Sequence, residues 1–119
     1  MARNVLLVTG GGRSGKSRYA LERAMRYPVR GFVATAEPFD DEMRIRIGKH
    51  REERGDAFIT VEEPVNLAAA IGGLAGKVDV VLVDCLTVWL GNLMYRHPEM
   101  NAGIPPELHA LLDVLEALP

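Results

Sequence analysis

The chain reads Val5-Leu-Leu-Val-Thr9 near its N-terminus, followed at once by Gly10-Gly-Gly-Arg-Ser-Gly-Lys-Ser17. The first segment is an apolar, β-branched run typical of a buried strand. The second matches G-x-x-x-x-G-K-[ST], a loop whose backbone N–H groups surround a phosphate. The helix-forming stretch Arg18–Met25 follows, so strand, loop and helix come in the order that a P-loop requires. The alternative is a glycine-rich turn that binds nothing.

The residue types of this loop suit a nucleoside triphosphate. Its glycines permit backbone angles that are closed to other residues, and the helix that follows offers unpaired N–H donors at its positive end. Lys16 is expected to reach the β- and γ-phosphates, and the Ser17 hydroxyl to ligate Mg²⁺. The predicted nucleotide-binding residues of the loop are Gly10, Gly11, Gly12, Arg13, Ser14, Gly15, Lys16 and Ser17. The loop alone does not specify the reaction.

The overall composition limits the class of protein. A length of 119 residues predicts a single domain over 1–119, and 48% hydrophobic residues suffice for a core. A net charge of -2 argues against general nucleic-acid binding. The one cysteine, Cys85, excludes an internal disulfide and a cysteine-based zinc site, and we expect its thiol to be reduced and buried. No segment reaches transmembrane length or forms a signal sequence, so we expect a cytoplasmic protein.

Strand-like and helix-like segments alternate along the chain. The expected strands are Val5–Thr9, Gly31–Thr35, Ala57–Val61 and Val78–Asp84, and the expected helices are 16–26, 40–54, 64–74, 87–96 and 105–118. Alternation of this kind predicts an α/β fold with a mainly parallel sheet. Trp89, Leu90 and Leu93 are spaced to pack their helix on the sheet. The last helix carries an apolar stripe that should lead back to a further strand, and because none follows we expect either a natural minimal form or a fragment.

Two carboxylates follow expected strands. Asp84 ends an apolar run, as does the carboxylate that helps to hold Mg²⁺ in P-loop enzymes. Glu62 also follows the carboxyl end of a strand, where ligands bind in open α/β sheets. The alternative for Asp84 is a residue that only begins the next loop or helix. Glu63 and Pro64 are expected to begin the next helix.

The expected helix 40–54 is highly charged and contains a histidine. Met43, Ile47 and His50 have the spacing of residues on one helix face, and Lys49 and Arg51 add positive charge beside the histidine. A histidine in such a setting can act as a nucleophile toward phosphorus. From spacing alone, a structural or surface histidine is the favoured interpretation.

Together these motifs resemble the adenosylcobinamide kinase / adenosylcobinamide-phosphate guanylyltransferase family of cobalamin biosynthesis. The resemblance extends from residue 3 to about residue 96. It rests on the segments 7–18, 32–36 (Phe-Val-Ala-Thr-Ala) and 40–43 (Asp-Asp-Glu-Met), on Arg46, Ile47 and His50, and on 60–62, 82–87 and Asn92-Leu93. The Arg-Ser pair within the P-loop and the acidic stretch before His50 are more specific than a P-loop alone.

The resemblance implies a P-loop, RecA-like parallel sheet and two reactions at one site. ATP or GTP phosphorylates the aminopropanol hydroxyl of adenosylcobinamide, and GTP then transfers GMP to that phosphate through a GMP–histidine intermediate. His50 matches that histidine, which reverses the interpretation from spacing, and Lys16 and His50 are the implied catalytic residues. The implied nucleotide contacts beyond the P-loop are Ala34, Thr35, Ala36, Arg51, Glu52, Glu53, Arg54, Glu62 and Asp84, with Ser17 and Asp84 as ligands of Mg²⁺.

The resemblance also concerns assembly and length. Family members form homo-oligomers and continue past a helix like 105–118 into a further strand and further helices. We therefore expect the chain to lack the C-terminal part of the family. Two alternatives stay open: a P-loop small-molecule kinase without guanylyl transfer, and an inactive GTP-binding fragment.

Overall fold

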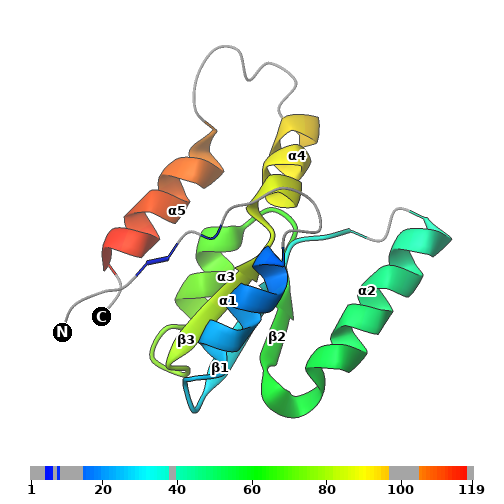
Figure 1. The fold of residues 1–119 in the computed structure, drawn as a ribbon. Helices are drawn as coiled ribbons and strands as arrows, with labels where there is room; N and C mark the ends of the chain where they lie inside the picture. Colours follow the sequence, from blue (N-terminus) through cyan, green and yellow to red (C-terminus); the bar gives the residue numbers. More distant parts are fainter. Residues whose placement is uncertain (1–4, 7, 9–14, 38–39, 97–104, 118–119) are drawn as a thin grey trace.

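A computed structural model describes residues 5–6, 8, 15–37, 40–96 and 105–117 of the chain. Helices and strands alternate through this part, which confirms the α/β class (Figure 1). The elements are α1 (Lys16–Ala24), β1 (Arg30–Ala34), α2 (Asp41–Arg54), the 3-10 turn η1 (Gly55–Ala57), β2 (Ile59–Glu62), α3 (Leu67–Leu74), β3 (Val80–Asp84), α4 (Leu86–Arg96) and α5 (Pro106–Ala117).

The three strands form one parallel sheet with the order β2-β1-β3. In its register, Val33 of β1 lies opposite Val61 of β2 and Val83 of β3. As the central strand, β1 is the most buried of the three, and Val33 has no exposed surface. The parallel arrangement that the alternating sequence predicts is confirmed.

Helices cover both faces of the sheet, and each face has its own core. Successive strand residues point to opposite faces, so Val33 and Phe32 belong to different cores. The larger core comprises Val33, Leu67, Ile71, Leu74, Trp89, Leu93 and Leu111, from β1, α3, α4 and α5. The smaller core comprises Ala24, Phe32 and Phe58 and lies against α1. In it the rings of Phe32 and Phe58 meet edge to face, with centroids 5.7 Å apart.

A glycine allows α3 to pack closely on the central strand. A Cβ atom added to Gly31 of β1 would lie 2.9 Å from Leu74 Cδ1 and 3.4 Å from Val78 Cγ2. A Cβ contact of 2.9 Å does not occur in real structures, so a side chain at residue 31 would force the end of the Leu74 side chain to move.

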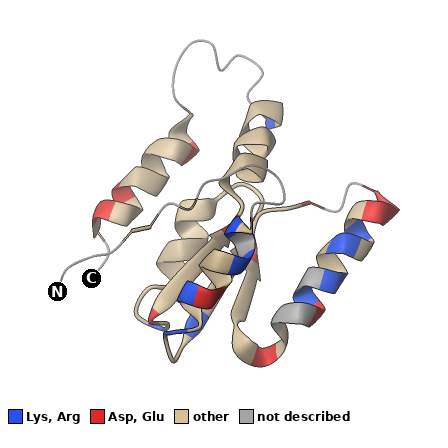
Figure 2. Cartoon of the chain, in the orientation of Figure 1, with Lys and Arg blue, Asp and Glu red and all other residues tan. Residues whose placement is uncertain are grey.

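Helix α2 lies to one side of the sheet, next to β2 (Figure 1). Its side chains are mostly charged, whereas α4 and α5 carry few charges (Figure 2). The Asp40 carboxylate caps its N-terminus by accepting a 2.7 Å hydrogen bond from the Met43 N–H. Arg44 and Arg46 pair within the helix with Asp41 and Glu42, one turn away. These pairs are exposed, so they add little to stability.

Two expectations about elements need correction. Val5, Leu6 and Val8 lie outside any strand, and Val5 and Leu6 are more than half exposed; Leu7 and Thr9 are outside the described residues. Glu63 and Pro64 do not begin a helix. Instead the Glu63 carboxylate accepts the N–H groups of residues 65 and 66 and forms a turn, so α3 starts at Leu67.

Predictions about individual side chains are confirmed in part. Trp89 and Leu93 are buried in the larger core, but Leu90 is 40% exposed because it lies about 100° around α4 from Trp89, at the margin of the buried stripe. The thiol of Cys85 is only half-buried. The last helix is present as α5, but it packs mainly on α3 rather than directly on the sheet.

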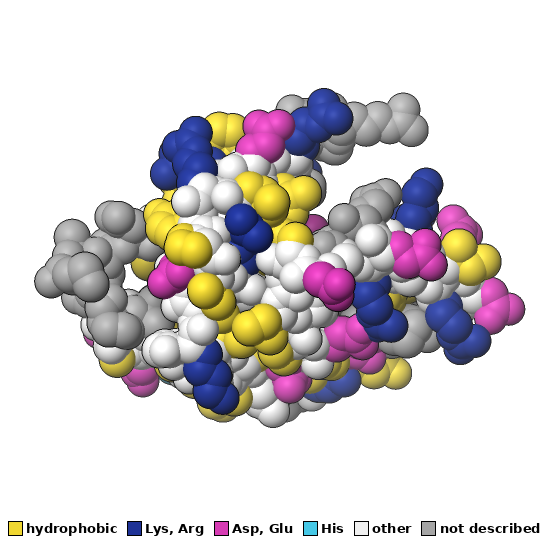
Figure 3. Space-filling view, turned by 90° about the horizontal axis from the view of Figure 1, so that it is seen from below, with side chains coloured by type: hydrophobic (Ala, Val, Ile, Leu, Met, Phe, Trp, Pro, Cys, Tyr) yellow, Lys and Arg dark blue, Asp and Glu magenta, His cyan; other side chains and the backbone are white. Residues whose placement is uncertain are grey.

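The surface where the strands begin carries apolar side chains among separate acidic and basic ones (Figure 3). Met25, Tyr27 and Val29, in the connection from α1 to β1, are all exposed. Within the described residues, no helix combines the length and the apolar character needed to cross a bilayer.

Candidate nucleotide site at the carboxyl end of the sheet

The three strands end side by side and place two carboxylates around a small residue. Ala34, the last residue of β1, lies opposite Glu62 of β2 and Asp84 of β3. Neighbouring strands are about 4.8 Å apart, so the Cα atoms of Glu62 and Asp84 are separated by about 10 Å. The carboxyl end of a parallel sheet is also where ligands bind in α/β proteins.

The register also gives the face to which these residues belong. Because side chains alternate along a strand, Ala34 and Asp84 share the face of Phe32 and Leu82, which is the α1 face. Glu62 shares this face, since it is in register with Ala34. The expected placement of both carboxylates at the carboxyl end of the sheet is therefore confirmed.

Helix α1 begins at this same end of the sheet (Figure 1). It packs beside β3 and starts at Lys16, directly after Gly15. Gly15 has φ +84°, a left-handed conformation that favours glycine and turns the chain into the helix. Lys16 therefore lies in the first turn of a helix whose N–H groups point toward the carboxyl end of the sheet, where Asp84 lies.

An ion pair joins the charged helix α2 to the sheet. The guanidinium of Arg51 contacts the carboxylate of Glu62, and both side chains are about half exposed. This differs from the ion pairs of Arg44 and Arg46, which remain within α2. Arg51 therefore ties the C-terminal half of α2 to the carboxyl end of β2.

Thr35 connects the end of β1 to the end of β3. Its N–H donates to the Asp84 carbonyl at 3.2 Å, and its hydroxyl donates to the Cys85 carbonyl at 2.8 Å. The same hydroxyl accepts the Cys85 N–H at 2.9 Å. Thr35 is fully buried, and these bonds satisfy its polar atoms as burial requires.

Helix α4 supplies three further hydrogen bonds that sequence reasoning missed. The side-chain amide of Asn92 donates to the Thr35 carbonyl at 2.8 Å and to the Pro64 carbonyl at 3.0 Å. The Trp89 ring N–H donates to the Val65 carbonyl at 2.7 Å. A signal was present in the sequence: Asn92 stands between Trp89 and Leu93 on the apolar stripe of the helix, where a polar residue needs partners.

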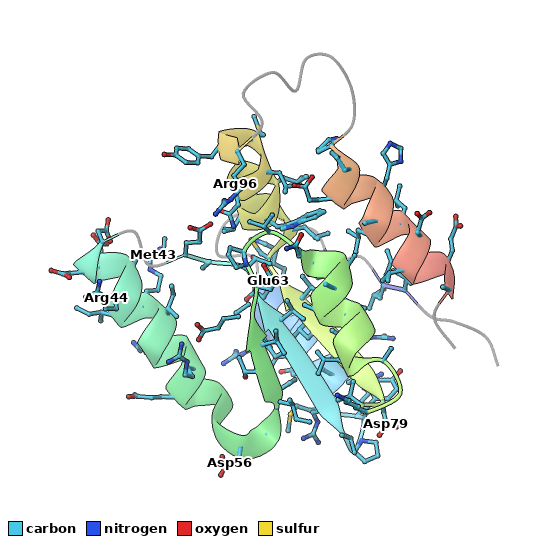
Figure 4. All side chains as sticks on the ribbon, turned by 180° about the vertical axis from the view of Figure 1, so that it is seen from behind. Met43, Arg44, Asp56, Glu63, Asp79 and Arg96 are labelled. Carbon is cyan, nitrogen blue, oxygen red and sulfur yellow. The ribbon has the colours of Figure 1, made fainter. Side chains whose placement is uncertain are left out.

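The loop after β1 is also held by charge. Arg96 of α4 lies 3.0 Å from a carboxylate oxygen of Glu37 and donates to the Asn92 carbonyl. Figure 4 shows Arg96 and Glu63 at this end of the sheet, whereas Asp56 and Asp79 lie at the opposite end. The loops that follow β1 and β2 are thus both fastened to α4.

Several predicted site residues lie outside the described part of the chain. Residues 10–14, which form most of the P-loop, and the side chains of Ser17, His50, Glu53 and Arg54 lie outside the described part. Glu52 is described and is exposed on α2. The predicted residues that the structure brings to one end of the sheet are Gly15, Lys16, Ala34, Thr35, Ala36, Glu62 and Asp84, with Arg51 joined to them through Glu62.

The described residues offer few protein ligands for a metal ion. Among them, no group of three or more histidine, cysteine, aspartate or glutamate side chains gathers as a metal centre. Magnesium in nucleotide sites is held by one or two carboxylates together with phosphates. The exposed carboxylate of Asp84 at the strand end fits that donor set.

A parallel sheet covered on both faces, with its acidic strand ends beside the first turn of a helix that follows G-x-x-x-x-G-K-S, defines a P-loop α/β protein. The family model described as cobinamide kinase / cobinamide phosphate guanyltransferase matches residues 6–119. The chain therefore belongs to this family.

Individual proteins with names from the same pathway also match the chain. The chain is 43% identical over 115 residues to the bifunctional adenosylcobalamin biosynthesis protein CobP of Pseudomonas aeruginosa, a match that covers 95% of this chain and 65% of the relative. It is 38% identical over 126 residues to the bifunctional adenosylcobalamin biosynthesis protein CobU of Escherichia coli. It is 36% identical over 126 residues to the bifunctional adenosylcobalamin biosynthesis protein CobU of Salmonella typhimurium. Each of these two matches covers 97% of this chain and 70% of the relative. The chain thus spans about two thirds of the length of these relatives.

Proposed function

We propose that this protein phosphorylates adenosylcobinamide and then transfers GMP from GTP to the resulting phosphate. The observation that carries the proposal is the common end of the sheet, where Glu62, Asp84 and the first turn of α1 with Lys16 share one face. Family membership and the P-loop sequence indicate which ligand this end receives.

In the kinase step, the aminopropanol hydroxyl attacks the γ-phosphorus of ATP or GTP, and the nucleoside diphosphate leaves. The P-loop N–H groups and the Lys16 ammonium stabilise the charge on the β- and γ-phosphates. Asp84 and the Ser17 hydroxyl would hold Mg²⁺, which supplies further charge neutralisation when bound. Thr35 keeps the end of β3 in place, because it bonds to both Asp84 and Cys85.

In the transfer step, a ring nitrogen of His50 attacks the α-phosphorus of GTP and pyrophosphate leaves. The phosphate of adenosylcobinamide phosphate then attacks the same phosphorus, which forms the pyrophosphate bond and frees His50. The position of Arg51 supports this role, since it follows His50 directly and its side chain reaches Glu62 at the strand end. The Arg51–Glu62 pair therefore ties the helix that bears His50 to the proposed nucleotide site.

We propose the remaining nucleotide contacts, the assembly and the cellular location on the basis of the same family resemblance. Guanine nucleotide contacts are proposed for Ala34, Ala36, Arg51, Glu52, Glu53, Arg54 and Glu62. For Thr35, which is fully buried, the proposed role is to hold the strand ends that border the nucleotide. We further propose a homo-oligomer that works in the cytoplasm. The alternatives are a small-molecule kinase in which His50 is structural and a domain that binds GTP without turnover.

One experiment separates these functions. The protein is incubated with adenosylcobinamide, ATP and α-labelled GTP, and both corrinoid products and labelled protein are measured. Phosphorylated and guanylylated corrinoid together support the bifunctional assignment. Phosphorylation without any labelled protein or guanylylated product supports the simple kinase, and GTP binding with no product supports the binding domain. Absence of nucleotide binding contradicts all three.

A further inference from the structure

Asn92 connects two loops that belong to different strands. Its amide nitrogen lies 2.8 Å from the Thr35 carbonyl, in the loop after β1, and 3.0 Å from the Pro64 carbonyl, in the loop after β2. Asn92 itself is 5% exposed. The two carbonyl groups come from positions 29 residues apart in the sequence, so no local structure holds them together.

The chemistry of this contact requires an amide. Both partners are carbonyl oxygens, which only accept, so the group between them must present two N–H donors. Aspartate has the same size but no donor when it is ionised, and leucine fills the space without any polar atom. Loss of the donors would leave the buried Thr35 carbonyl and the part-buried Pro64 carbonyl without this hydrogen bond, which is costly.

The helix that carries Asn92 is itself firmly placed. The flanking residues Trp89 and Leu93 are 1% and 0% exposed in the larger core. Trp89 also bonds to the Val65 carbonyl in the second loop, and Arg96 pairs with Glu37 in the first. Helix α4 thus holds Asn92 in a fixed position in contact with both loops.

These two loops border the proposed nucleotide site. Thr35 and Ala36 follow β1, and Glu62 ends β2 just before Pro64. We infer that Asn92 is a positioning residue for the nucleotide: by holding the Thr35 and Pro64 carbonyls on one amide, it fixes the spacing between the Ala34–Ala36 segment and Glu62. This inference rests on the proposed function, because it assigns those segments to the nucleotide.

The test compares N92D and N92A with L93A. L93A removes a core side chain from the same helix and leaves the polar contacts in place, so it lowers stability without disturbing the two loops. The GTP dissociation constant is measured at a temperature well below the Tm of every variant, and the KM for GTP and kcat are measured in turnover assays. Amide hydrogen exchange is followed at residues 35–37, 63, 65 and 66 in the nucleotide-free protein.

We expect N92D and N92A to bind GTP about tenfold more weakly than wild type, as the loss of two hydrogen bonds allows. The loss should appear in KM more than in kcat, because α1 and α2 carry the reacting groups. Exchange should become faster in both loops, whereas L93A should lower Tm and leave GTP affinity within about twofold of wild type. If N92A does not fold, N92S serves in its place.

Unchanged GTP affinity in N92D, unchanged exchange in either loop, or an equal loss of affinity in L93A overturns the inference. If wild-type protein fails to bind GTP, the proposed function fails instead. The exchange comparison then still decides whether Asn92 holds the two loops, so the two failures are distinguishable.

Discussion

Thr35 and Cys85 bond to each other twice: the Thr35 hydroxyl donates to the Cys85 carbonyl at 2.8 Å and accepts the Cys85 N–H at 2.9 Å. The pair extends the contact between β1 and β3 beyond the last residues of both strands. One hydroxyl thereby satisfies two backbone groups of the neighbouring strand. Asp84, which precedes Cys85, is held by a separate bond, because its carbonyl accepts the Thr35 N–H at 3.2 Å.

Replacement of Thr35 by valine should therefore be costly. The substitution keeps the shape of the side chain but leaves the Cys85 N–H and carbonyl without their partner, at about 1–3 kcal/mol of unfolding free energy. Urea unfolding of T35V measures this loss. T60V is the matched control, because Thr60 lies half-buried in the edge strand β2. Equal stability of T35V and wild type would contradict the importance of this bond.

Two glycine substitutions should act in opposite directions. G31A places a Cβ atom 2.9 Å from Leu74 Cδ1 and should lower the unfolding free energy by about 1–3 kcal/mol. G48A lies within α2, where an added Cβ meets no atom within 4 Å, and should raise it by about 0.5–1 kcal/mol. Thermal unfolding of the two variants side by side checks the prediction. A tolerated G31A would mean that α3 moves away from β1 without cost.

Lys16 tests the phosphate site. In K16A the loop loses the ammonium that is proposed to contact the β- and γ-phosphates, so nucleotide affinity should fall by about 10- to 100-fold, the range for hydrogen bonds to charged groups. Both reactions should be lost with it. K77A is the control, since Lys77 is exposed in the turn before β3. Isothermal titration with GTP and ATP measures the effect, and wild-type affinity with wild-type turnover in K16A would refute the nucleotide site.

The Arg51–Glu62 pair should matter more for transfer than for stability. Both side chains are about half exposed, so E62Q should change the unfolding free energy by only about 0–1 kcal/mol. The rate of GMP transfer should fall more strongly, because α2 loses its tie to the strand end. E42Q, which breaks an exposed pair within α2, should leave both quantities near wild type. Equal transfer rates in E62Q and E42Q would argue against the role of the pair.

Much of the fold can be predicted from the sequence because its signals are local. Apolar runs and helix-forming stretches predicted four strands and five helices. Three of those strands and all five helices are present in the described residues, with boundaries within three residues of the prediction, whereas Val5, Leu6 and Val8 lie outside any strand. The start of α3 was missed because Glu63 and Pro64 match the signals of a helix start, while the Glu63 carboxylate closes a turn instead. Leu90 was misplaced because α4 packs on the sheet with only one narrow face.

Part of the site could be predicted, because residue type and position at a strand end were sufficient to locate the two carboxylates. The placement of Glu62 and Asp84 at the carboxyl end of the sheet followed from the apolar runs before them, and the structure confirms it. The bonds among Thr35, Cys85 and Asn92 were not predictable in this way. They join residues 50 to 57 positions apart, and their pairing depends on how α4 lies against the loops.

The most direct test of the central claim is whether GTP forms a covalent GMP adduct on His50. Wild-type, H50A and H109A proteins are incubated with α-labelled GTP and Mg²⁺, and the label retained on denatured protein is measured after acid and after base. His109 is exposed on α5, so H109A controls for the loss of a histidine away from the site. The account predicts an acid-labile, base-stable label on wild-type and H109A proteins and none on H50A. Equal labelling of H50A, or no label on wild-type protein that binds GTP, would contradict it.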